Sequence, residues 1–300
     1  KEDDYYLLLE DLLPGDYSIT EIDVPDGWDG PDNPINVTVI AGDVVDVEFT
    51  NVFMTGELRI TKDFDFTGIA GFVPASMLPD SINVKVTGPS YPEPDGKVVP
   101  ISIDDLGDGT VLLDNLIPGT YTVAELSFTD SEKWDSDIDP ASVEVVSDAA
   151  EVVVVTITNT FMPGELRITK DFDFTGIVGF DPATMLPDTI TVDVTGPSYP
   201  NGTEVTITID DFGDGTTLLQ NLIPGDYYVE ELEFTGSEDW DSDIDSSPAE
   251  VKAGEVTAIE VMITNTFEPG ELRITKTFDF SDIEGFVAAT MLPNSITVKV

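Results

Sequence analysis

The heptapeptide GELRITK occurs three times in the chain, at residues 56–62, 164–170 and 270–276, and its copies begin 108 and then 106 residues apart. Other phrases recur in step with it, such as LPGDY at 13–17, IPGTY at 117–121 and IPGDY at 223–227. A fixed period of this length indicates a tandem array of one domain-sized unit. Each unit therefore has to fold around a core of its own.

The positions of these phrases divide the chain into two complete units and two partial ones. We expect a rear portion of a unit at 1–53, complete units at 54–162 and 163–268, and a front portion at 269–300. Such a window gives no information on export or anchoring signals. The connections at 161–164 and 267–270 are very short, which predicts units stacked end to end with little freedom.

Apolar residues alternate or run together in short segments, with Pro, Gly and Asp between them. In the first complete unit these segments are 58–66, 81–86, 98–103, 110–113, 120–125, 142–146 and 152–159. No segment has a convincing helical period. About seven short strands per unit predict an all-β fold in which each unit is an antiparallel β-sandwich.

The charge of the chain excludes several classes of partner. Sixty acidic residues stand against 12 basic ones, for a net charge of −48. Nucleic acid is excluded, because phosphate contacts need Lys and Arg, and a bare acidic membrane surface is equally unsuited. Hydrophobic residues make up 41% of the chain, so the acidic residues belong to a sequence that builds cores rather than to a disordered tail.

The chain has no Cys and no His. This composition removes thiol nucleophiles, imidazole acid–base chemistry, His-ligated metals and disulfides. An extracellular chain without disulfides needs another source of mechanical and proteolytic resistance. Lysine, carboxylates, amides and hydroxyls are the reactive groups that remain.

Three polar residues in each complete unit share strand parity with apolar neighbours and so face the core. On the first strand Lys62 aligns with Leu58, Ile60 and Phe64. The same test gives Lys62, Glu125 and Asn159 in the first complete unit and Lys170, Glu231 and Asn265 in the second. Glu21 and Asn51 occupy these positions in the first partial unit, and Lys276 occupies the lysine position in the last.

A buried lysine, glutamate and asparagine have to meet, because an unpaired buried ammonium or carboxylate costs roughly several kcal/mol. Transfer of a proton from lysine to glutamate leaves a neutral amine beside a neutral acid. The amine can then attack the carboxamide carbon, with the glutamate polarising the carbonyl and moving protons, and ammonia leaves. The alternative is a hydrogen-bonded cluster in which no bond forms.

The opening GxLxIxK, the middle PGxYxxxE and the closing TNTF together resemble CnaB-type (collagen-adhesin B, prealbumin-like) repeat domains of microbial surface proteins and pili. This resemblance covers essentially the whole chain. It implies Ig-like or prealbumin-like sandwiches with autocatalytic Lys–Asn isopeptide bonds. It makes Lys62–Asn159 and Lys170–Asn265 the cross-linked pairs, with Glu125 and Glu231 as their catalytic groups. By the same resemblance Glu21, Asn51 and Lys276 belong to triads whose other members lie outside the window.

The acidic segment WDSDID occurs twice and provides a second candidate site. It places carboxylates on one side of an extended segment at Asp135, Asp137 and Asp139, and again at Asp241, Asp243 and Asp245. Carboxylate oxygens are ligands for hard cations, so a Ca²⁺ site is one hypothesis. The alternative is a solvated acidic edge that discourages sheet pairing. The isopeptide chemistry itself requires no cofactor.

These features favour a structural protein: an extracellular, cell-surface stalk or filament of tandem sandwiches, stiffened by internal isopeptide bonds. Its partners would be further copies of the same repeat or chain. An adhesin module that binds a host or matrix ligand through sandwich surfaces or acidic loops is the alternative. The chain has no constellation typical of an enzyme that acts on external substrates. No membrane span is expected in this window.

Overall fold

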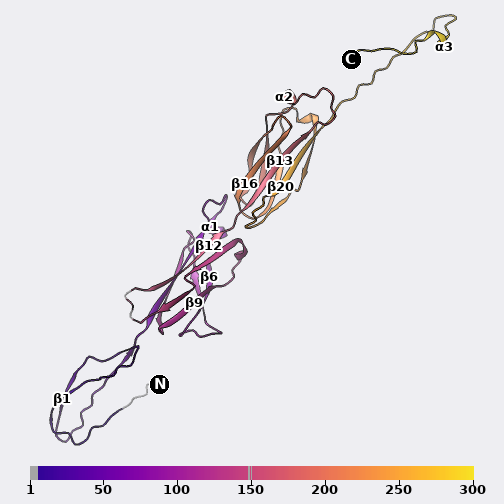
Figure 1. Cartoon of the computed structure of the whole chain (residues 1–300). Helices are drawn as coiled ribbons and strands as arrows, with labels where there is room; N and C mark the ends of the chain where they lie inside the picture. The colour runs from indigo at the N-terminus through magenta and orange to yellow at the C-terminus, as the bar shows by residue number, and fades with distance from the viewer. Residues whose placement is uncertain (1–5, 148, 150) are drawn as a thin grey trace.

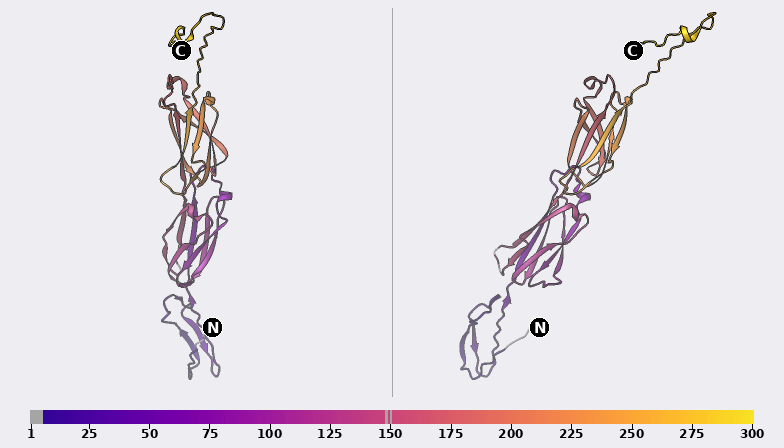
Figure 2. Two further views of the ribbon diagram at one scale, coloured as in Figure 1. Left: turned by 90° about the vertical axis from the view of Figure 1, so that its right-hand side faces the viewer. Right: turned by 45° about the vertical axis from the view of Figure 1, so that its right-hand side comes forward.

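The computed structural model describes residues 6–147, 149 and 151–300. Two β-sandwiches follow one another along an elongated molecule, with a smaller β segment at the N-terminal side and an extended segment at the C-terminal side (Figures 1 and 2). Residues 1–5 of the first predicted partial unit lie outside the described residues. The described chain contains no helix with the length and apolar character needed to cross a membrane.

The first sandwich consists of two four-stranded sheets. One has the order β10-β12-β5-β8, and the other β11-β9-β6-β7. Its elements are β5 (Gly56–Asp65), α1 (Pro74–Met77), β6 (Ser81–Thr87), β7 (Lys97–Ser102), β8 (Gly109–Leu116), β9 (Gly119–Glu125), η1 (Ser131–Lys133), β10 (Trp134–Asp139), β11 (Ser142–Val145) and β12 (Val153–Phe161).

The second sandwich repeats this arrangement, with sheet orders β16-β13-β20-β18 and β15-β14-β17-β19. Its elements are β13 (Gly164–Asp173), α2 (Pro182–Met185), β14 (Thr189–Gly196), β15 (Tyr199–Thr208), β16 (Asp214–Leu222), β17 (Gly225–Glu231), η2 (Ser237–Asp239), β18 (Trp240–Asp245), β19 (Ala249–Val251) and β20 (Ile259–Phe267). The all-β tandem sandwich expected from the strand pattern is confirmed.

One strand pair in each sandwich is parallel, whereas the others are antiparallel. β5 pairs with β12 and β13 pairs with β20, so the first and last strands of each unit are neighbours that run in the same direction. The chain thus enters a unit at one end of this pair and leaves it at the other. Consecutive units follow in line for this reason.

The cores confirm the parity assigned to the strands. Along β5 buried and less buried residues alternate, and Leu58, Ile60 and Phe64 are almost completely buried. Tyr121 and Val123 on β9 and Val155 and Ile157 on β12 face the same core. Val, Ile and Leu suit these positions because branched side chains pack well on a pleated surface.

Each complete unit has eight strands, one more than the pattern predicts. The additional strand is WDSDID, which forms β10 and β18 at a sheet edge beside β12 and β20. Its alternation of acidic and other residues obscures the strand signal, because only one of its faces contacts the core. One-turn helices also follow the first strands at α1 and α2, each with Pro in its first turn.

The flanking segments contain little packed structure. The N-terminal segment forms two two-stranded sheets from β1 (Gly15–Ile19), β2 (Trp28–Asp29), β3 (Ile35–Val39) and β4 (Val52–Phe53). The C-terminal segment contains the one-turn helix α3 (Ala288–Met291), and its GELRITK copy forms no strand in the described structure. None of the described residues in 6–53 or 269–300 is buried.

Candidate functional site: a buried Lys–Glu–Asn triad

Three strands from both sheets bring the polar triad of the first complete unit together. Lys62 lies on β5 and Asn159 on the neighbouring parallel strand β12, where the register pairs Asn159 with Phe64, two residues beyond the lysine. Because both positions have the same parity, both side chains project into the sandwich. Glu125 ends β9 in the opposite sheet and reaches them across the core.

The glutamate is the common partner of the lysine and the asparagine. Asn159 Nδ2 donates to both carboxylate oxygens of Glu125 at 3.1 Å, and Lys62 Nζ lies 3.9 Å from Glu125 Oε1. Lys62 Nζ also donates to the backbone carbonyl of Asp63 at 2.8 Å and lies 3.7 Å from the centre of the Phe64 ring. The amine and the amide therefore share one carboxylate.

The second unit has the same geometry. Asn265 Nδ2 donates to Glu231 Oε1 at 3.3 Å, and Lys170 Nζ lies 3.7 Å from the same oxygen. Lys170 Nζ donates to the carbonyl of Asp171 at 3.0 Å and lies 3.9 Å from the centre of the Phe172 ring. Two separate segments of sequence thus build the same site.

Burial alters the chemistry of both lysines. Lys62 is 1% exposed and Lys170 0% exposed. Desolvation lowers the pKa of each from 10.5 to about 8, although the neighbouring Glu125 or Glu231 carboxylate opposes the shift. The neutral amine, which is the nucleophilic form, is therefore much more populated near neutral pH than in a solvated lysine.

Aromatic side chains enclose the site on one side. The ring of Phe64 lies edge-to-face with that of Trp134, at a centroid distance of 4.8 Å, and Trp134 packs against Phe161 at 5.0 Å. Trp134 is 7% exposed, so it serves as a packing residue. These rings exclude water from the lysine and cause much of its desolvation.

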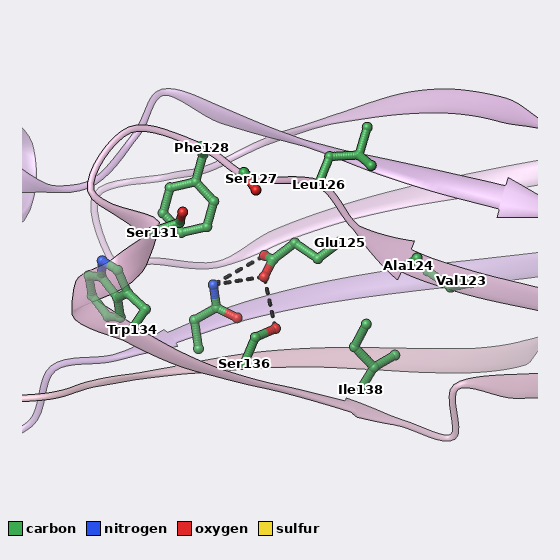
Figure 3. Close-up of a pocket in the computed structure, with 11 residues that line it drawn as sticks. Val123, Ala124, Glu125, Leu126, Ser127, Phe128, Ser131, Trp134, Ser136 and Ile138 are labelled. Carbon is green, nitrogen blue, oxygen red and sulfur yellow. Dashed lines mark hydrogen bonds between the residues drawn. The ribbon is translucent and has the colours of Figure 1, made fainter. Parts of the chain in front are cut away.

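A serine that parity alone could have identified completes the site. Ser136 Oγ donates to Glu125 Oε2 at 2.8 Å (Figure 3). In the second unit Ser242 Oγ donates to Glu231 Oε2 at the same distance. Both serines lie in the WDSDID strand between two aspartates. Their parity matches that of the inward Trp134, but the acidic residues drew attention to the opposite face of the strand.

The amide oxygen of the triad asparagine has no hydrogen-bond partner among the described residues, although it is buried. This holds for Asn159, Asn265 and Asn51. The glutamate accepts hydrogen bonds from the amide nitrogen, and polarisation of the carbonyl by the glutamate after it has taken the lysine proton stays a prediction. An ionised carboxylate has no proton with which to bond a carbonyl oxygen.

A pocket opens beside the triad of the first unit (Figure 3). Its lining includes Glu125, Ser136 and Asn159 together with Phe128 and Trp134. The side chain of Glu125 is 9% exposed, whereas that of Lys62 is fully buried. The carboxylate is therefore the member of the triad that can exchange small molecules and protons with solvent.

The partial units contain the expected residues in incomplete sites. Asn51 Nδ2 donates to Glu21 Oε1 at 2.9 Å, which reproduces the Glu–Asn contact of the complete units. Gly30 follows the β2 strand where Ser136 follows Asp135, and Glu21 Oε2 is buried without a partner among the described residues. Lys276 is exposed, with its Nζ 4.8 Å from the ring centre of Phe278.

The aspartates proposed for calcium lie apart from the triads. Asp135, Asp137 and Asp139 are exposed along β10, and Asp241, Asp243 and Asp245 are exposed along β18. Within the described residues no group of three or more carboxylates is arranged to hold a metal ion. Alternate residues of a strand are about 6.6 Å apart, too far to converge on one ion without a bend. Calcium binding there stays a hypothesis that no contact supports.

Comparison with solved structures finds several that align with most of this chain at low identity. The Bacillus anthracis TIE protein aligns with 78% of this chain and 37% of its own length, at 18% identity and a TM-score of 0.43. The major pilin of Streptococcus pyogenes aligns over 70% of this chain and 97% of its own, at 16% identity and a TM-score of 0.37.

Two B repeat units of the Staphylococcus aureus collagen-binding protein align over 72% of this chain and 50% of their own, at 16% identity and a TM-score of 0.26. No protein-family model and no curated protein matches the chain.

Proposed function

We propose that the chain is part of an extracellular structural filament or stalk whose units are cross-linked by autocatalytic Lys–Asn isopeptide bonds. The observation that carries this proposal is a fully buried lysine whose carboxylate partner also holds the amide of an asparagine, in both complete units. A buried lysine of lowered pKa beside an amide is poised for acyl transfer, whereas a purely structural ion pair needs no amide.

The reaction balances without a cofactor. The Lys62 ammonium first gives a proton to Glu125, and the neutral Nζ attacks Asn159 Cγ. Glu125 then delivers its proton to the departing Nδ2, with which it already forms hydrogen bonds, the Cγ–Nδ2 bond breaks, and the carboxylate takes up the second proton that Nζ loses. The products are an Nζ–Cγ amide, which keeps the Asn159 oxygen, and one ammonia. The fold holds the lysine amine and the asparagine amide in contact, so no separate enzyme is needed. Each site reacts once, because the reaction consumes both groups.

The pocket beside Glu125 suits the departure of ammonia. It opens next to Asn159 and the carboxylate of Glu125, whereas Lys62 does not line the pocket and is buried. Loss of ammonia through this opening would make the reaction irreversible in practice. Ser136 holds the carboxylate in the orientation that faces the amide.

The position of the bond suits a filament under tension. Lys62 and Asn159 lie on the strands by which the chain enters and leaves the unit, and these strands are parallel neighbours. With the bond in place, a pulling force passes from β5 to β12 through the two side chains. The residues between 62 and 159 then carry no load, so the sandwich cannot be pulled apart.

Localisation at the cell surface follows from the same considerations. A chain without disulfides that is exposed to proteases gains from bonds that close a large loop, because closure restricts the unfolded state. The incomplete triads at Glu21–Asn51 and Lys276 extend the array in both directions. The adhesive alternative stays a hypothesis, since no contact identifies a ligand.

Peptide mapping tests the proposal. Trypsin should fail to cleave after Lys62 and Lys170, because an acylated lysine is not a substrate, and branched peptides should join Lys62 to Asn159 and Lys170 to Asn265. Cleavage after exposed Lys97 is the internal control. Linear peptides that end at Lys62 and Lys170 would show that the triads are hydrogen-bonded clusters and would refute the proposal.

A further inference from the structure

The loop that follows the first strand of each unit forms a projecting turn, with the sequence FTGIAGF at 66–72, FTGIVGF at 174–180 and FSDIEGF at 280–286. We call each copy the plug. Between the two sandwiches the first plug contacts the second unit: the Ala70 amide donates to the carbonyl of Asn221 at 3.1 Å. The helix α1, which follows this plug, lies at the junction in Figure 1, whereas α2 lies at the far end of the second unit.

The second unit offers a shaped surface to this plug, formed by Ser198, Asn221 and Ile223, which we call the receptor. Ile223 is 3% exposed and belongs to the apolar cluster of the first unit rather than that of its own. Gly71 has a left-handed conformation, with φ of +73°, and a Cβ there would collide with the backbone of Ser198. Only glycine permits so close an approach.

The receptor is rigid because a buried tyrosine supports it. Tyr227 donates its hydroxyl proton to the carbonyl of Ile223 at 2.9 Å and accepts the Ser198 amide at 3.1 Å. Ser198 Oγ in turn accepts the Ile223 amide at 2.8 Å. The Asn221 backbone lies in the left-handed region, with φ of 55°, which turns its carbonyl outward to meet Ala70.

The first unit has the same receptor at its other end, without an occupant among the described residues. Tyr121 donates to the Ile117 carbonyl at 2.9 Å, Ser90 Oγ accepts the Ile117 amide at 2.8 Å, and Asn115 has φ of 54°. Ile117, however, is 45% exposed. The receptor therefore has the same backbone conformation and hydrogen bonds with and without a bound plug.

The plugs are preformed as well. The two phenylalanines of each plug stack at centroid distances of 4.6, 4.5 and 4.6 Å, in the order of the chain. Val178, the counterpart of Ala70, is fully exposed, and a Cβ on Gly179 would meet no atom of the described residues within 4 Å. The phenylalanines stack in the same way in docked and free plugs. Docking therefore does not have to order the plug, and its cost in conformational entropy is small.

We propose that the plug and receptor form a repeat-to-repeat docking site, whose partner is the receptor end of a neighbouring copy of the same repeat unit. Plug and receptor lie at opposite ends of a unit, because the plug follows the end of β5 whereas Leu116 pairs with Gly56 at its start. Such a head-to-tail contact between unlike surfaces builds an open linear array. The contact fixes the orientation of neighbouring units and does not depend on the isopeptide bond.

Hydrogen–deuterium exchange on the 300-residue chain, in which no receptor follows the second plug, tests the docking directly. The Ala70 amide should exchange at least about tenfold more slowly than the Val178 amide, after correction for intrinsic rates, because only Ala70 has a partner across a junction. The two plugs differ at one residue within the FTGIxGF motif, so each serves as the control for the other. Equal protection of both amides would overturn the proposal.

A matched pair of glycine variants separates docking from folding. Gly71→Ala and Gly179→Ala place the same Cβ on the same left-handed backbone, but only the first meets Ser198. Spin labels on cysteines introduced at exposed Asp137 and Asp243 report the distance between the units by pulsed electron resonance. Gly71→Ala should broaden the distance distribution and remove the protection of Ala70, whereas Gly179→Ala should leave both unchanged. Equal effects of the two variants, or no effect of either, would contradict specific docking.

Discussion

Lys62 is the residue whose environment decides the chemistry of a unit. Its charge lies where a strand needs an apolar side chain, and the nearby aromatic rings and the single carboxylate partner leave it poorly solvated. Removing water from an ammonium favours the neutral amine, and a neutral amine beside an amide is a reactive pair. Lys170 repeats this environment, so the lowered lysine pKa is a feature of the repeated fold rather than of one unit.

The serine on β10 should affect how fast the bond forms. Ser136→Ala removes the hydrogen bond that orients Glu125 toward the amide and leaves that carboxylate free to rotate. We expect slower loss of ammonia from this unit when a newly synthesised chain that has been kept unfolded folds for the first time, while the second unit reacts at its normal rate. Ser142→Ala, at an exposed position on β11, is the control. Time-resolved intact mass gives the rates, and unchanged kinetics would show that Ser136 has no positioning role.

The lowered lysine pKa predicts how stability depends on pH when no bond can form. In the Asn159→Ala/Asn265→Ala variant the folded chain releases the lysine protons at about pH 8, but the unfolded chain holds them to about 10.5. The unfolded state therefore binds more protons in this window, and the free energy of unfolding rises with pH across it. Denaturant titrations should show this rise.

The control for that pH dependence is the same double variant with Lys62→Met and Lys170→Met added. It keeps every tyrosine and carboxylate, so their titrations cancel in the comparison. The difference between the two profiles should appear between pH 8 and 10.5. Parallel profiles would mean that the buried lysines have ordinary pKa values.

At the scale of strands, the pairing of the first and last strands explains why the proposed bond would be useful. β5 and β12 lie side by side and parallel, so a force on the chain ends shears one against the other. Hydrogen bonds between strands resist shear only until they rupture together. A covalent bond between the same strands removes this mode of failure.

Single-molecule pulling on the full chain should detect the bond through the length released. An intact complete unit should give no unfolding step for the residues between Lys62 and Asn159, because the bond carries the load. Asn159→Ala should add one step of about that length, and Asn83→Ala, at an exposed position of β6, should add none. A step of this length in the unaltered chain would contradict the cross-link.

Period-two parity predicted the faces of β5, β9 and β12 correctly, because each strand has one face on the core and one in water. It did not predict the parallel pairing of β5 with β12, since parity reports which face is buried and not which strand is the neighbour. The strand β10 and its Ser136 were missed because a half-exposed edge strand rich in Asp has a weak apolar signal. The distances between the triad atoms could not be predicted from parity, because they depend on how all three strands pack together.

At the scale of the whole molecule, the acidic charge affects contacts between parallel chains, whereas the plug and receptor form contacts between consecutive units. The net charge of −48 is distributed along an elongated array, so parallel chains repel each other over their full length. The plug and receptor act only end to end and rely on backbone bonds and apolar contact. Together these two features predict association along the axis of the molecule rather than side by side.

Small-angle scattering as a function of salt checks this repulsion. The Debye length falls from about 30 Å at 0.01 M salt to about 8 Å at 0.15 M, so the repulsive depression of low-angle intensity should disappear over that range. The end-to-end shape of each chain should stay the same. Addition of calcium provides a second arm, in which lateral aggregation at constant ionic strength would contradict repulsion as the role of the acidic surface.

The intact mass of the denatured chain tests the central claim most directly. With both triads reacted, the chain should weigh two molecules of ammonia less than its sequence requires. Glu125→Gln should restore one ammonia and Glu125→Gln/Glu231→Gln both, while Glu132→Gln, at an exposed position, should leave the loss unchanged. A chain of unaltered sequence that has the full mass of that sequence would contradict the isopeptide bonds and leave a hydrogen-bonded triad in each unit.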